Sequence, residues 1–148
     1  MTFSLLTNRN FRLLWLAQIA ATLGTELYNV AVIVTVFQGT GSVLQTTGVV
    51  VARMAPSLFL GQMAGALVDR YPRRMVMLAV NLFRAAIIAV TATLPSVWVA
   101  IPWVGYCVVV ALAVAEILYL PAQRALTPTL VEPSKLVSAN SLIYTATP

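Results

Sequence analysis

Four ionisable side chains lie inside long apolar stretches of this sequence: Glu26, Arg53, Arg84 and Glu116. A charge at the centre of a membrane helix costs about 2.5 to 3.5 kcal/mol unless it is paired or faces water. Glu26 precedes the turn near Thr40 by about as many residues as Arg53 follows it. At equal helical rise the two groups lie at one depth. The spacing therefore permits an ion pair across two neighbouring helices.

Further polar residues share the helix face of Glu26. At about 100° per residue they fall within one third of the helix circumference, and they are Gln18, Thr22, Thr25 and Asn29. One salt bridge does not require such a stripe, so it favours a polar cavity in which Glu26 binds a proton or a substrate cation and Arg53 modulates it. The alternative is that Glu26 with Arg53, and Arg84 with Glu116, are structural ion pairs only.

The composition excludes most other chemistries. The chain has no histidine, which removes His-based acid–base catalysis and the Ser-His-Asp triad. Its only cysteine, Cys107, lies in an apolar run, so a disulfide framework or thiolate cluster cannot form. The basic residues are not gathered on one polar face, as nucleic-acid binding requires. We expect no enzyme activity, no metal, no cofactor and no nucleic-acid partner.

The elements that position these groups are those of a membrane protein. Hydrophobic residues make up 60% and charged residues 9% of the 148 residues, against about 45–50% and about 25% in soluble domains. A membrane-spanning helix needs about 20 mostly apolar residues. The sequence predicts an all-α membrane protein with four transmembrane helices and the start of a fifth, at about 11–37, 43–68, 75–94, 98–120 and 136–148.

Two connecting segments separate the predicted helices. Residues 38–42 contain two glycines and no apolar residue, which is typical of a turn. Residues 121–135 contain three prolines and many polar residues, so we expect a connector on the membrane surface. The fifth apolar run ends about a dozen residues after it begins, which is too short to span. We therefore expect the chain to be part of a longer protein.

The basic residues predict the orientation in the membrane. Cytoplasmic loops carry an excess of Lys and Arg. Seven of the nine basic residues lie in the loops or at the ends of the predicted spans, all on one side, and they are Arg9, Arg12, Arg70, Arg73, Arg74, Arg124 and Lys135. The loops on the opposite side carry none. We expect a multi-pass protein of the cytoplasmic (cell) membrane with a cytoplasmic N-terminus.

The loop after the second predicted helix carries a longer motif. Residues 65–74 read GALVDRYPRR and resemble the loop G-x-x-x-D-R-x-G-R-R between helices 2 and 3 of the major facilitator superfamily. The matching positions are Gly65, Asp69, Arg70, Arg73 and Arg74, while Pro72 stands where the family usually has glycine. The segments NRNFRLLWLAQIAATLG and LYLPAQRALTPTLVEPSKLVSAN look like the branch that includes macrolide-efflux-type proteins and the enterobactin exporter.

The resemblance implies a transporter of twelve helices in two six-helix halves that rock around a central site. This chain would cover the N-terminal part, helices 1 to 4 and the start of 5, without the C-terminal half. By the same resemblance, Asp69 is a conformational latch that contacts helix 11, and Gly65 permits close helix packing. The loop arginines would bind cytoplasmic helix ends and lipid headgroups.

These features predict a proton-coupled secondary exporter, an antiporter, of amphiphilic small molecules of the drug or siderophore type. Its partners are the lipid bilayer, protons, a small-molecule substrate and the missing C-terminal half. Two alternatives remain open. One is a small four-helix multidrug exporter that acts as a dimer and also uses a Glu in its first helix. The other is a non-transporting membrane subunit whose buried charges are structural.

Overall fold

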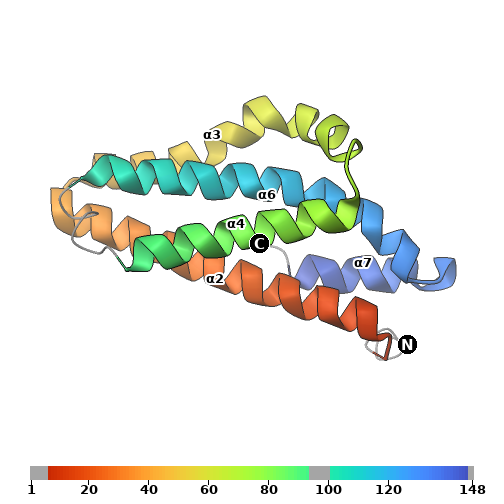
Figure 1. Cartoon of the computed structure of the whole chain (residues 1–148). Helices are drawn as coiled ribbons and strands as arrows, with labels where there is room; N and C mark the ends of the chain where they lie inside the picture. Colours follow the sequence, from red (N-terminus) through yellow and green to blue (C-terminus); the bar gives the residue numbers. More distant parts are fainter. Residues whose placement is uncertain (1–6, 94–100, 147–148) are drawn as a thin grey trace.

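The computed structural model describes residues 7–93 and 101–146, which form a bundle of long helices (Figure 1). The elements are α2 Arg9–Thr40, α3 Val43–Val68, α4 Arg73–Ala92, α6 Pro102–Leu130, the short 3₁₀ helix η1 Pro133–Lys135 and α7 Leu136–Thr145. Of these, α2, α3, α4 and α6 are long and apolar enough to cross a membrane. The prediction of an all-α membrane protein with four spans and the start of a fifth is confirmed.

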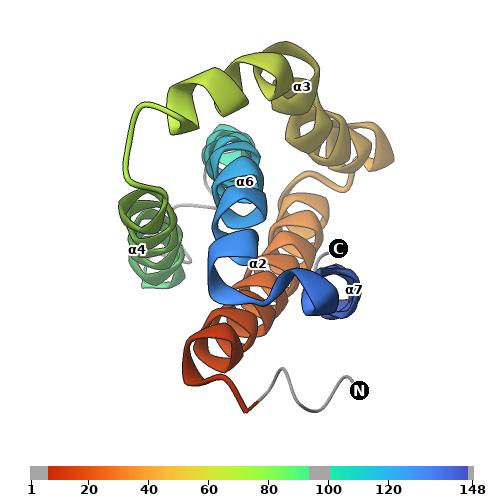
Figure 2. The same ribbon diagram turned by 90° about the vertical axis from the view of Figure 1, so that its right-hand side faces the viewer.

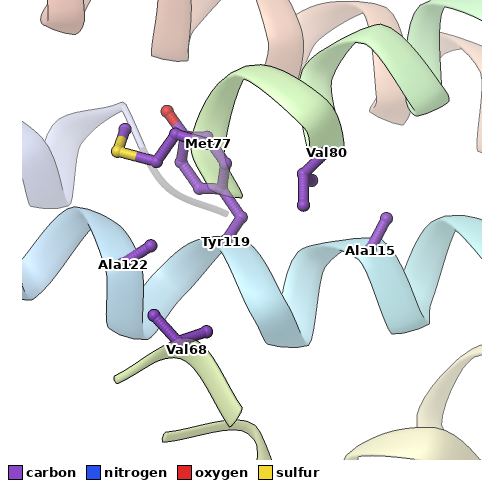
Figure 3. Packing of buried hydrophobic residues seen from close by; sticks show 6 residues of the cluster. All are labelled: Val68, Met77, Val80, Ala115, Tyr119 and Ala122. Carbon is purple, nitrogen blue, oxygen red and sulfur yellow. The ribbon is translucent and has the colours of Figure 1, made fainter. Parts of the chain in front are cut away.

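Helix α6 lies at the centre of the bundle, with α2, α3, α4 and α7 around it (Figure 2). Val68, Met77, Val80, Ala115, Tyr119 and Ala122 form a core between α3, α4 and α6 (Figure 3). A second core joins α2, α3 and α6 through Val32, Val36, Val49 and Val109. Helix α6 contributes to both cores. It is therefore the element against which α2, α3 and α4, the helices that carry Glu26, Arg53 and Arg84, are packed. Many large apolar side chains on the outer faces stay exposed, as a lipid-facing surface requires.

The first helix is longer than predicted at both ends. The Asn8 side chain accepts hydrogen bonds from the backbone N–H groups of Asn10 and Phe11 and so begins α2 at Arg9. The helix continues through Thr40, and Gly41 ends it with a φ of 62°, its N–H donating to the Phe37 carbonyl at 2.8 Å. The predicted turn at 38–42 therefore shrinks to two residues, and only its second glycine adopts the left-handed conformation.

The fourth helix also extends beyond its predicted end at residue 120. Helix α6 continues through Pro121 and Pro128 to Leu130, so most of the expected connector is helical. Each proline removes one backbone donor, but Ala122, Gln123 and Thr127 are almost fully buried in the bundle. Packing thus holds this part in a helix, and the end of α6 bends away from its earlier axis (Figure 1). The predicted helix limits at 94, 98 and 148 lie outside the described residues.

Candidate functional site

Glu26 and Arg53 form a salt bridge between α2 and α3. Arg53 Nη2 donates to Glu26 Oε1 at 2.5 Å, and Arg53 Nη1 donates to Glu26 Oε2 at 3.2 Å. Both N–H groups are therefore used in a two-point contact, the strongest geometry between these groups. The side chains keep 36% and 33% of their surface exposed. The pair predicted from spacing forms, and it lies at the edge of the bundle rather than in its core.

The polar stripe of α2 divides between several neighbours. Gln18 Nε2 donates to Thr22 Oγ1 at 3.3 Å, and Thr22 Oγ1 donates to the Ala146 carbonyl at 2.9 Å. This connects the N-terminal half of the stripe to the end of α7. Thr25 instead lines a groove on the α4 side. The stripe residues therefore meet different neighbours, and among the described residues the salt bridge of Arg53 is to Glu26.

Two amides in the stripe are buried without complete partners. Asn29 is 5% exposed, and neither its Oδ1 nor its Nδ2 has a hydrogen-bond partner in the described part of the chain. The same holds for Gln18 Oε1. A buried polar atom without a partner costs about 1 to 3 kcal/mol. Such atoms favour a role beyond holding helices together.

Arg84 does not pair with Glu116. Among residues 7–93 and 101–146, the salt bridges join Arg53 to Glu26, Arg73 to Asp69 and Lys135 to Glu132. Arg84 is 5% exposed and lies over the Tyr119 ring, with Cζ 5.4 Å from the ring centroid. A cation over an aromatic face is attracted to it. The alternative of a direct Arg84–Glu116 ion pair is therefore wrong.

The loop between α3 and α4 lies at the surface. Asp69 caps the end of α3, and α4 begins at Arg73 without a glycine, since Pro72 adopts φ −58°. Arg73 Nη2 lies 3.8 Å from Asp69 Oδ1, and the Asp69 side chain is 69% exposed. Arg70 lines the rim of an apolar groove of about 400 Å³ between α3 and α6.

The remaining loop positions stay free of close packing inside the bundle. A Cβ added at Gly65 would meet nothing within 4 Å in the described chain. The close helix contact expected there is not made with α2, α4, α6 or α7. Arg74 is exposed at the start of α4. Close contacts occur instead at Gly48, where a Cβ would lie 2.8 Å from the Tyr106 hydroxyl, and at Gly105.

Several polar links between helices were missed in the sequence. The Tyr28 hydroxyl donates to Thr91 Oγ1 at 2.6 Å and ties α2 to α4. The Trp15 indole N–H donates to the Leu142 carbonyl at 2.9 Å. The contact of the Tyr119 ring with Arg84 was not predicted either. A polar aromatic residue within an apolar span is the signal that could have indicated each of them.

Fold and site together define a multi-pass α-helical membrane protein that holds charged side chains inside its membrane segments. A family model described as "transmembrane secretion effector", of the major facilitator type, matches residues 1–145. The chain therefore belongs to this family of membrane transporters, as the loop motif predicted. No curated protein and no solved structure matches the chain.

Proposed function

We propose that this chain is the N-terminal part of a proton-coupled exporter of amphiphilic small molecules in the cytoplasmic membrane. The observation that carries the proposal is the two-point Glu26–Arg53 salt bridge, one third exposed, beside buried polar groups without partners. Loading a substrate cation or a proton onto Glu26 weakens its attraction to Arg53. Glu26 is thereby the coupling carboxylate, and Arg53 is the group it releases.

The mechanism follows from competition for one carboxylate. With Arg53 bound to Glu26, α2 and α3 are held together at this depth. A proton on Glu26 frees the guanidinium and biases the bundle toward a second arrangement, in which the substrate leaves. Asp69 at the cytoplasmic end of α3 then acts as the latch between arrangements, as the loop motif implies. A ligand shifts such an equilibrium only by its different affinity for the two states.

Proton-driven efflux of ethidium from proteoliposomes tests the proposal, using the longer transporter to which the chain is proposed to belong. Glu26→Gln is expected to abolish the dependence on the proton gradient, while Glu26→Asp retains part of it. Glu132→Gln is the matched control, because Glu132 is 70% exposed and, among the described residues, forms its salt bridge with the nearby Lys135. Full gradient-driven efflux by Glu26→Gln would contradict the proposed coupling and favour a structural salt bridge.

The 148-residue chain by itself is expected to insert into vesicles without efflux, because alternating access requires a second half to rock against. Purified chain in proteoliposomes with a proton gradient measures this directly. Substrate-specific efflux by this chain would support the alternative of a small exporter that acts as a dimer.

The proposed cytoplasmic N-terminus is testable by cysteine labelling in a Cys107→Ser background. Gln38→Cys is expected to react with an impermeant maleimide from outside the cell, and Tyr71→Cys only after permeabilisation. Gln38 is used because Gly41, with its φ of 62°, would strain any side chain. The reverse labelling pattern would overturn the orientation.

A further inference from the structure

A groove between α2 and α4 is lined in part by Arg84, whose Nε and Nη2 have no acceptor among the described residues. The groove has a volume of about 260 Å³. Its walls include Ala17, Ala20, Gly24 and Thr25 from α2, with Asn81 and Arg84 from α4. A Cβ built at Gly24 meets nothing within 4 Å, so the space beside α2 is open. The α2 wall is made of small side chains, and the guanidinium comes from α4.

The guanidinium of Arg84 is engaged on its face and free on its edge. Its face packs on Tyr119. In contrast, Nε and Nη2 are buried and have no acceptor in the described chain. The N–H bonds of these two atoms point in the same direction, which matches the two oxygens of a carboxylate. Arg84 therefore holds an oriented pair of buried donors, and 5% of the whole residue is exposed.

Two further polar atoms lie in the same groove. Thr25 Oγ1 and Asn81 Oδ1 are both buried, and both lack a partner within residues 7–93 and 101–146. A threonine hydroxyl can donate to a carboxylate oxygen, and an amide oxygen accepts from a hydroxyl or N–H group. Residues from two helices that each carry an unpartnered buried atom thus line one groove. Neighbouring positions 17, 20 and 24 offer only apolar surface.

We propose that this groove binds the carboxylate of a small, largely apolar molecule, with Arg84 as the two-point anchor. Its volume of about 260 Å³ limits the ligand to a small molecule. The carboxylate lies against Nε and Nη2, and the apolar part lies against Ala17, Ala20 and Gly24. The site differs from the Glu26–Arg53 pair, which joins α2 to α3, and it does not rest on the proposed transport function.

Benzoate binding to the chain in phosphatidylcholine nanodiscs tests the site, with neutral benzamide as the matched ligand. Equilibrium dialysis of labelled benzoate is expected to give saturable binding at one site, with at least tenfold weaker binding of benzamide. Arg84→Gln should lose the site, whereas Arg12→Gln, which removes an exposed arginine of α2, should retain it. Benzoate binding that is equal in wild type and Arg84→Gln would overturn the proposal.

A second variant keeps the test independent of the folding of Arg84→Gln. Gly24→Leu fills the groove and leaves the anchor in place, so benzoate binding should fall at least tenfold, while Gly24→Ala should bind as wild type does. Wild-type affinity in Gly24→Leu would contradict the assigned location.

The carboxylate can come from solution or from the bilayer, and oleate incorporated in the nanodiscs distinguishes the sources. Benzoate binding that oleate leaves unchanged indicates a solution ligand. Arg84-dependent thermal stabilisation by oleate without benzoate binding indicates a fatty-acid site. Either result supports carboxylate recognition, and absence of both would overturn it.

Discussion

The salt bridge between α2 and α3 and the arginine of α4 show two ways of keeping a cation inside apolar surroundings. Arg53 is satisfied by a carboxylate from the neighbouring helix and is one third exposed. Arg84 is almost fully buried, packs on an aromatic ring and has no salt bridge among the described residues. The charge of Arg53 is balanced by one partner, the Glu26 carboxylate. Arg84 depends on packing, and its Nε and Nη2 have no acceptor in the described part of the chain.

The largest effect on stability is expected at the Glu26–Arg53 salt bridge, because Arg53 depends on the Glu26 carboxylate. Glu26→Gln leaves Arg53 charged and unpaired, and should destabilise the folded chain by about 2 kcal/mol, between the values for exposed and fully buried pairs. Thermal unfolding in detergent, followed by tryptophan fluorescence, measures this change.

The reverse substitution sharpens the dependence of Arg53 on Glu26. Arg53→Gln should cost less than Glu26→Gln, because a carboxyl group can take up a proton and become neutral whereas a guanidinium cannot. The double variant Glu26→Gln/Arg53→Gln should recover part of the loss, and the cycle gives the coupling energy. Strictly additive losses would show that the two side chains act independently.

Substitution of Arg84 is expected to change stability in the opposite direction. Arg84→Met removes a buried charge that forms no salt bridge among the described residues and fills similar volume, so the chain should gain about 1 kcal/mol despite losing the cation–aromatic contact. Tyr119→Phe is the control, since it keeps the ring beneath Arg84 and removes only a hydroxyl. The same unfolding assay compares both variants. A loss from Arg84→Met as large as that from Glu26→Gln would remove the distinction between the two cations.

This distinction also marks how far the sequence could predict the molecule. The four spans follow from length and hydropathy, and Glu26–Arg53 follows from counting residues on either side of one turn. Both need only local information. The partner of Arg84 depends on how α4 and α6 rotate against each other, which no spacing within one helix specifies. The face shared by Glu116 and Tyr119 is readable, but the choice of the ring over the carboxylate is made by packing.

Helix ends show the same limit. Pro121 and Pro128 predict an end to the fourth helix, yet burial of Ala122, Gln123 and Thr127 keeps it helical to Leu130. The stripe on α2 was recognised in sequence, but its residues divide between α3, α4 and α7 because a helix at the side of a bundle has several neighbours. Local patterns identify the polar residues, and tertiary packing decides which of them meet.

The smallest stability effect is expected at the surface pair of the α3–α4 loop, and it separates stability from function. Asp69 is 69% exposed and lies 3.8 Å from Arg73, so Asp69→Asn should change stability by less than about 0.5 kcal/mol. Its effect on ethidium efflux by the longer transporter should nevertheless be large, because a latch acts on the balance between two states. Arg73→Gln is the matched control: it breaks the same salt bridge from the other side and leaves the Asp69 carboxylate available to another helix.

Reduced efflux in Asp69→Asn with near-normal efflux in Arg73→Gln would assign the effect to the carboxylate itself. Equal losses in both variants would assign it to the salt bridge, and unchanged efflux in Asp69→Asn would remove the latch and leave the loop charges with a role in orientation alone.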